Sequence, residues 1–152
     1  MLNALQVERH YFVEIRLNAE IGLNEAELKK RSLTCRPNLA WSHKPGDTTY
    51  WLAKLRLDLT HAGDGAKSLY TGVMENAGEF RLHPDVPEKD RHKYVAMNAG
   101  AILYGAMREW VAAMTARSLH GMVELPVIDA RCFIPKETET AKTPELPPPS
   151  IS

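Results

Sequence analysis

Hydrophobic and polar residues alternate along two segments in the first half of the chain. Within residues 10–18, one face carries Tyr11, Val13, Ile15 and Leu17, and the other carries His10, Phe12, Glu14 and Arg16. Within residues 49–61, one face carries Trp51, Ala53, Leu55, Leu57 and Leu59. A period of two is typical of a strand with one buried face. We therefore predict two half-buried β-strands.

Two further strands are predicted beside these. The run Ala62, Gly63, Asp64 and Gly65 favours a tight hairpin turn, so residues 67–78 are expected to fold back antiparallel on residues 49–61. Residues 32–43 place Leu33, Cys35, Leu39 and Trp41 on one side. Pro37 within this segment cannot donate a backbone hydrogen bond, which predicts an edge strand or a bulge.

A different period begins after a polar, proline-rich loop at residues 83–93. Residues 98–118 form a predicted helix with a large-residue face of Leu103, Met107, Trp110, Val111 and Met114. The other side carries Gly105, Arg108, Glu109, Ala112 and Ala116. The Arg108–Glu109 pair excludes a membrane span, because its charges interrupt the apolar run. The small residues would let a neighbouring element approach the helix closely.

The remaining chain divides into an extended segment and a tail. Residues 119–135 are apolar but are broken by Gly121 and Pro126, which predicts an extended crossing. Residues 136–152 cannot bury apolar area and are predicted to be a disordered, proline-rich tail. We therefore expect one domain over residues 1–135. Strands followed by a long helix predict an α+β fold with an antiparallel sheet covered on one face.

Composition narrows the function classes. Lys plus Arg and Asp plus Glu number 19 each, so the chain is neutral, which argues against a nucleic-acid-binding protein. The N-terminal residues lack the apolar core of a signal peptide, so a cytoplasmic location is expected. In that reducing compartment, Cys35 and Cys132 are predicted to be buried thiols rather than a disulfide.

The sequence lacks the usual signatures of catalysis or cofactor binding. It has no phosphate-binding glycine loop and no nucleophile elbow, and its six histidines are scattered without a metal-ligand spacing. Glu109 is a candidate catalytic carboxylate, but it points in a different direction from the adjacent Arg108 on a helix, so a helix-capping or interface ion pair is favoured. We therefore expect no catalytic residue, metal or cofactor, and a binding protein rather than an enzyme.

Such a protein would use exposed apolar surface. The candidate binding residues are Leu39, Trp41, Met122, Val123, Val127, Ile128 and Phe133. For each of these side chains, burial in the core or in a subunit interface is an equal alternative to client binding. Met and aromatic side chains repack readily around different partners, which suits recognition of extended peptides.

Four stretches, taken in order, resemble the SecB family of export chaperones and its SecB-like relatives. The stretch ILYGAMREWVAAMTAR at residues 102–117 is similar to the long helix of the family, and VELPV at 123–127 to its crossing segment. NAGEF at 76–80 resembles the end of its hairpin, and VERHYFVEI at 7–15 its first strand. The resemblance covers residues 7–133.

The resemblance implies a four-stranded antiparallel sheet covered on one face by a long C-terminal helix, assembled as a homotetramer, a dimer of dimers. Gly105, Ala112 and Ala116 would form the tetramer contact, and Leu39 and Trp41 would line an apolar groove for unfolded or precursor polypeptides. The implied function is that of an ATP-independent holdase chaperone, in protein export or otherwise.

The family's export members dock the SecA motor through an acidic sheet surface. In this chain Glu14 is the candidate SecA contact, whereas Asn18 stands where a second acidic residue is expected. The alternative function is therefore an adaptor or assembly protein that binds one specific partner, such as an antitoxin-dedicated SecB-like chaperone.

Overall fold

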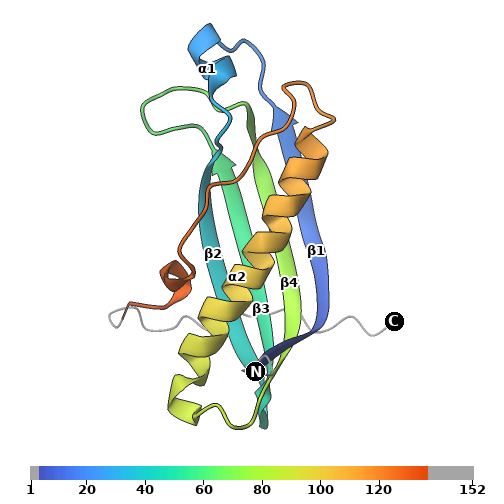
Figure 1. The fold of residues 1–152 in the computed structure, drawn as a ribbon, viewed down its shortest axis with the longest axis vertical. Helices are drawn as coiled ribbons and strands as arrows, with labels where there is room; N and C mark the ends of the chain where they lie inside the picture. Colours follow the sequence, from blue (N-terminus) through green and yellow to red (C-terminus); the bar gives the residue numbers. More distant parts are fainter. Residues whose placement is uncertain (1–3, 137–152) are drawn as a thin grey trace.

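The computed structural model describes residues 4–136 and places one long helix diagonally across one face of a four-stranded sheet (Figure 1). The predicted tail lies outside the described residues, except for Lys136. The elements in chain order are β1 (Leu5–Ala19), α1 (Glu25–Lys29), β2 (Thr34–Lys44), β3 (Asp47–Thr60), β4 (Tyr70–Leu82), α2 (Glu88–Thr115) and a 3₁₀ turn, η1 (Ala130–Phe133).

The strands pair in the order β1-β4-β3-β2, and every pair is antiparallel. This confirms the α+β prediction. β2 is an edge strand, as Pro37 indicated. Cys35, Leu39 and Trp41, at alternate positions along β2, pack against the core on the helix side of the sheet. Leu39 lies opposite Leu55, and Trp41 lies opposite Ala53. β3 keeps the predicted alternation, because Trp51, Ala53, Leu55, Leu57 and Leu59 are all buried.

β1 departs from the simple alternation predicted for residues 10–18. Its register with β4 shifts between Val7 and Arg9 and again between Phe12 and Glu14. Each bulge adds one residue to the strand and so reverses which side chains face the sheet's covered side. As a result Phe12 packs on the core, whereas Tyr11 and Val13 are 41% and 53% exposed.

The tight turn of the sheet is not where the sequence predicted it. It joins β2 to β3 at Gly46, whose φ of 80° suits glycine. The predicted turn at residues 62–65 is instead part of a longer loop between β3 and β4. That loop is held by Ser68, whose hydroxyl donates to the Thr60 carbonyl at 3.1 Å and whose amide donates to His61 Nδ1 at 3.2 Å.

α1 was not predicted, although its start carries a recognisable signal. The Asn24 side chain accepts from the Glu27 amide at 2.8 Å, and Glu27 Oε2 accepts from the Asn24 amide at 3.0 Å. This is a capping box. The Lys67 amide donates to the other oxygen of Glu27 at 3.0 Å. The short helix is therefore tied to the β3–β4 loop.

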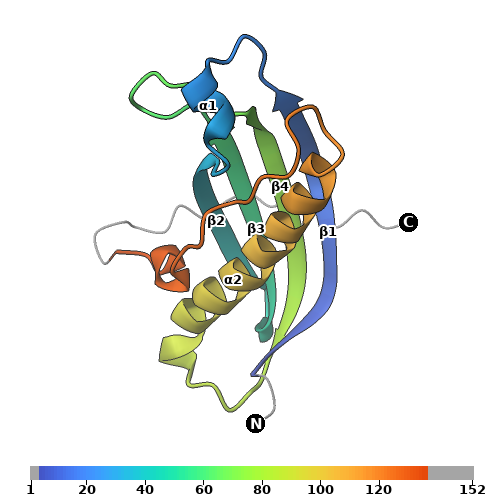
Figure 2. The ribbon, with the colours of Figure 1, turned by 45° about the horizontal axis from the view of Figure 1, so that its top comes forward.

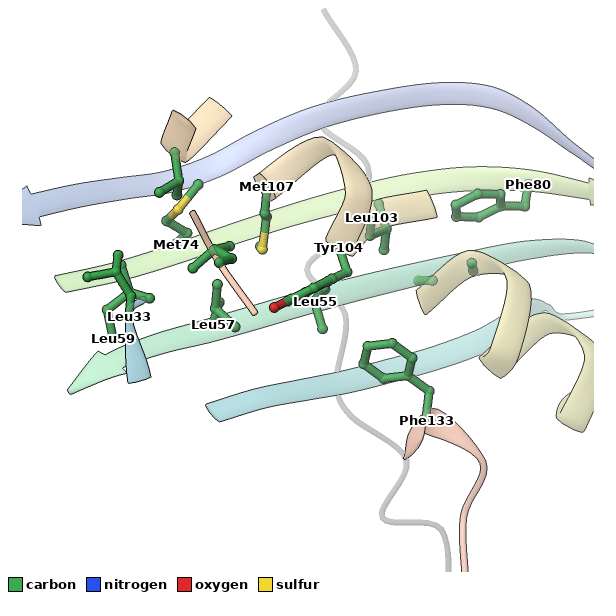
Figure 3. Packing of buried hydrophobic residues seen from close by; sticks show 14 of the residues in the cluster. Leu33, Leu55, Leu57, Leu59, Met74, Phe80, Leu103, Tyr104, Met107 and Phe133 are labelled. Carbon is green, nitrogen blue, oxygen red and sulfur yellow. The ribbon is translucent and has the colours of Figure 1, made fainter. Parts of the chain in front are cut away.

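α2 begins at Glu88, within the segment predicted to be a loop, and spans 28 residues. Pro87 precedes its first turn, and Glu88 and Asp90 complement the helix dipole there. Leu103, Met107 and Val111 of the predicted large face are fully buried, but Met114 is 46% exposed. Figure 3 shows this face packed above β3 and β4. None of the helices in residues 4–136 is long and apolar enough to cross a membrane.

Candidate functional site

The segment that follows α2, residues 119–134, is called the crossing segment below. It leaves the end of α2, passes over the sheet and descends beside the helix on the β2 side (Figures 1 and 2). Glu124 forms a parallel bridge with Ser32, and Val123 and Leu125 are buried. The extended conformation was predicted, but the turn η1 was not. Asp129 caps it by accepting from the Arg131 amide at 3.0 Å.

Three side chains of α2 hold the backbone of the crossing segment. The Tyr104 hydroxyl donates to the Pro126 carbonyl at 2.7 Å, and Arg108 Nε donates to the Leu125 carbonyl at 3.3 Å. Thr115 Oγ1 accepts from the Val123 amide at 3.0 Å. Arg108 and Glu109 form no ion pair within the described residues, and an ion pair at an interface stays a prediction. Tyr104, which was not predicted as a site residue, carries no motif that could have revealed it.

Phe133 anchors the far end of the crossing segment. Its ring lies directly on the backbone of Gly100, where a β-carbon would come within 2.4 Å of Cδ2. The residue is 7% exposed, and Figure 3 shows it pointing from η1 into the layer between helix and sheet. Only glycine at position 100 permits this approach.

A shallow pocket of about 150 Å³ lies between α2 and the crossing segment. It is lined by Ala101, Tyr104, Gly105, Arg108, Val127, Ile128, Ala130 and Phe133. The structure thus brings Gly105, predicted as an interface residue, next to three predicted binding residues. Leu39 and Trp41 do not line this pocket. They lie half-buried on β2 and pack against the core.

The predicted binding residues of the crossing segment differ strongly in exposure. Val127 is 81% exposed and Met122 is 55% exposed, whereas Val123 is buried like Phe133. Leu119, 70% exposed, adds to the apolar surface and was missed by the sequence reasoning. Its place directly after the helix, with no strand or helix pattern to bury it, was the available signal.

Trp41 carries an unusual polar atom. Its indole nitrogen is buried and has no hydrogen-bond partner among the described residues. A buried donor left without an acceptor costs about 1–3 kcal/mol. The other indole near this end of the sheet differs, because Trp51 Nε1 donates to the Thr48 carbonyl at 2.9 Å.

The two cysteines lie in different environments. Cys35 is half-buried, and its sulfur lies 3.6 Å from the Tyr104 hydroxyl oxygen. Burial raises the pKa of the Cys35 thiol, opposed by that hydrogen bond. Burial also raises the pKa of Tyr104, helped by the Cys35 contact. Cys132 is exposed, so the prediction of two buried thiols was wrong for this residue, whose place in the short turn η1 offers little cover.

Glu14 lies on the outer face of the sheet, the face turned away from α2. Its Oε1 accepts from Arg16 Nε at 2.8 Å, and its Oε2 lies 3.7 Å from Arg56 Nη1. Arg56 also lies 3.7 Å from Glu75, which in turn lies 3.6 Å from Lys54. The negative charge of Glu14 is therefore balanced by neighbouring arginines.

The predicted interface residues follow the open side of α2. Ala116 is exposed, Ala112 is half-buried, and a β-carbon on Gly105 would have no atom within 4 Å. Packing within the described chain therefore does not require glycine at position 105.

No protein-family profile and no curated protein matches the sequence. Among solved structures, the chain is similar to a SecB-like chaperone of Mycobacterium tuberculosis in complex with a ChAD peptide from the HigA1 antitoxin. The TM-score is 0.58 at 18% identity, over 82% of this chain and 91% of that one. A Streptococcus agalactiae protein of unknown function aligns with a TM-score of 0.45 at 13% identity, over 81% of this chain and 97% of that one. The chain thus has a SecB-like fold.

Proposed function

We propose that this protein is an ATP-independent holdase chaperone that binds extended segments of unfolded polypeptides. The observation that carries the proposal is the apolar surface of the crossing segment, where Leu119, Met122 and Val127 are each more than half exposed. Val127 lines the pocket on α2 together with the half-buried Ile128. Exposed apolar side chains beside a pocket are typical of a binding surface.

The proposed client surface uses the exposed and half-buried candidates. Met122, Val127 and Ile128 would contact the client on the crossing segment, and Leu39 and Trp41 would extend the surface onto β2. Val123 and Phe133 would support this surface from below, since both are buried. Ala112 and Ala116, on the open side of α2 beyond the pocket, would contact other copies in a homotetramer, whereas Gly105 of the predicted contact lines the pocket.

A chaperone dedicated to one partner is the second candidate. The similar M. tuberculosis protein is a chaperone in complex with an antitoxin peptide, and the pocket beside Arg108 is small enough to favour particular side chains. Delivery to SecA for export is less favoured, because Arg16 and Arg56 neutralise Glu14 on the outer face. A cytoplasmic location stays a prediction.

Aggregation of a chemically unfolded client, diluted into buffer with and without this protein and without ATP, tests the proposal. Val127→Asp should abolish most of the suppression, because it puts a charge on the proposed contact surface. Val13→Asp is the matched control, since Val13 is also exposed but lies on β1. Equal suppression by both variants would refute the proposed surface. Capture of immobilised SecA by the wild type would favour export instead.

A further inference from the structure

The pocket between α2 and the crossing segment contains a cation without a counterion among the described residues. Arg108 is half-buried, yet no carboxylate lies within ion-pair distance of its guanidinium there. Asp129 of the crossing segment is engaged by Arg131. Glu109 and Glu124 are exposed.

The other half-buried arginines of the described residues, Arg56 and Arg91, have ion-pair or hydrogen-bond partners. Arg56 has three carboxylates within 3.7 Å, and Arg91 donates to Thr48 Oγ1, the Val86 carbonyl and the Pro84 carbonyl. Arg108 donates one hydrogen bond within the described part of the chain, from Nε to the Leu125 carbonyl. A guanidinium stays protonated and carries five N–H donors. Its remaining donors are therefore open to an anionic ligand at the edge of the pocket.

The rest of the pocket is suited to one apolar side chain. The pocket is shallow and mainly apolar, and its volume of about 150 Å³ is enough for a group the size of benzene. Gly105 contributes a bare stretch of helix backbone to its wall, although an interior helical glycine costs about 1 kcal/mol relative to alanine. A β-carbon at this position would occupy pocket space, so glycine leaves room for a ligand to approach.

We infer that this pocket recognises an apolar side chain of the client together with a neighbouring Asp or Glu side chain that pairs with Arg108. The ligand is an internal segment rather than a chain terminus. Terminal carboxylates are usually captured by free backbone N–H groups, whereas the backbone N–H groups of α2 around Gly105 belong to the helix interior. A carboxylate and a guanidinium form a strong, geometrically specific pair. The inference rests on the proposed function and adds a sequence preference to it.

The test compares two amidated, fluorescently labelled peptides that differ only in a central Leu-Asp or Leu-Asn pair, titrated with the full chain by fluorescence anisotropy. Wild type should bind the Asp peptide about tenfold more tightly, as expected for a charge-assisted hydrogen bond. Added salt should reduce the difference. Arg108→Gln should remove the preference, and Arg117→Gln, at an exposed arginine just after α2, should retain it.

The ratio of the two affinities is measured within each variant, so a partial loss of folding in Arg108→Gln cancels. Equal binding of both peptides by wild type, or an unchanged preference in Arg108→Gln, would overturn the inference. If wild type still suppresses client aggregation in that case, the proposed function survives. If neither peptide binds and aggregation is not suppressed, both fail. A lower assembly mass of Arg108→Gln, with no effect on preference, would assign the arginine to a contact between copies.

Discussion

Two glycines of the same helix should respond oppositely to the same substitution. Gly105→Ala adds a methyl group to open space, so it should stabilise the chain by about 1 kcal/mol through helix propensity. Gly100→Ala gains the same propensity but puts its methyl 2.4, 2.6 and 2.9 Å from three atoms of the Phe133 ring. Real β-carbon contacts are longer, so the ring must move as a whole.

The cost of that movement follows from the burial of Phe133. Losing a buried phenylalanine costs about 3–5 kcal/mol, so Gly100→Ala should be destabilising by about 2–4 kcal/mol after the propensity gain. For a chain of this size, each kcal/mol shifts the melting temperature by about 2–4 °C. Thermal unfolding followed by circular dichroism should show a small rise for Gly105→Ala and a fall of about 4–16 °C for Gly100→Ala.

A double-mutant cycle separates the clash from other effects. In a Phe133→Ala background the ring is absent, so Gly100→Ala should become as mildly stabilising as Gly105→Ala. If Gly100→Ala remains equally destabilising in that background, contact with Phe133 is not the reason for the glycine, and the assignment of Phe133 as the anchor of the crossing segment is wrong.

Three further changes are expected to have measurable outcomes. Trp41→Phe removes a buried donor that has no partner among residues 4–136, so it should lower the denaturation midpoint by less than Trp51→Phe, which loses a hydrogen bond. The reverse order would contradict the burial of Trp41. Ala112→Leu should reduce the assembly mass in light scattering, because a large side chain would keep copies from meeting on α2; an unchanged mass would contradict this contact. Burial, and then the charge of His43, lower the pKa of His92, so stability should fall as pH drops below about 6.5; the fall between pH 7 and pH 5 should be smaller in His92→Gln.

The sequence predicted elements whose patterns do not depend on their neighbours. β3 is a central strand, and its alternation from Trp51 to Leu59 continues without interruption. β1 was predicted as one uninterrupted alternation, whereas the bulge that follows Phe12 arises from pairing with β4 and puts Phe12 on the same side as Leu17. The start of α2 was missed because its first turns are polar, whereas Glu88 and Asp90 are suitable residues for a helix N-terminus.

The pocket was less predictable than the fold. The separate candidates Gly105, Val127, Ile128 and Phe133 came from local composition, and the structure brings them together. What joins them is a set of side-chain contacts to backbone carbonyls, such as Tyr104 to Pro126. A carbonyl is present at every residue, so such a contact leaves no pattern in the sequence. The same holds for Arg108, which has no carboxylate partner among residues 4–136, because this depends on distances to acidic side chains.

The strand order also sets the sequence of events during synthesis. β2 and β3 are joined by a tight turn and can pair as soon as both have left the ribosome. β1 is made first, yet its one partner among the described strands is β4, and Leu5 pairs with Leu82. The N-terminal strand therefore waits unpaired while three other strands emerge, with Val7, Tyr11 and Val13 accessible throughout. During its own biogenesis this protein passes through the kind of extended, apolar state that a holdase would bind in others.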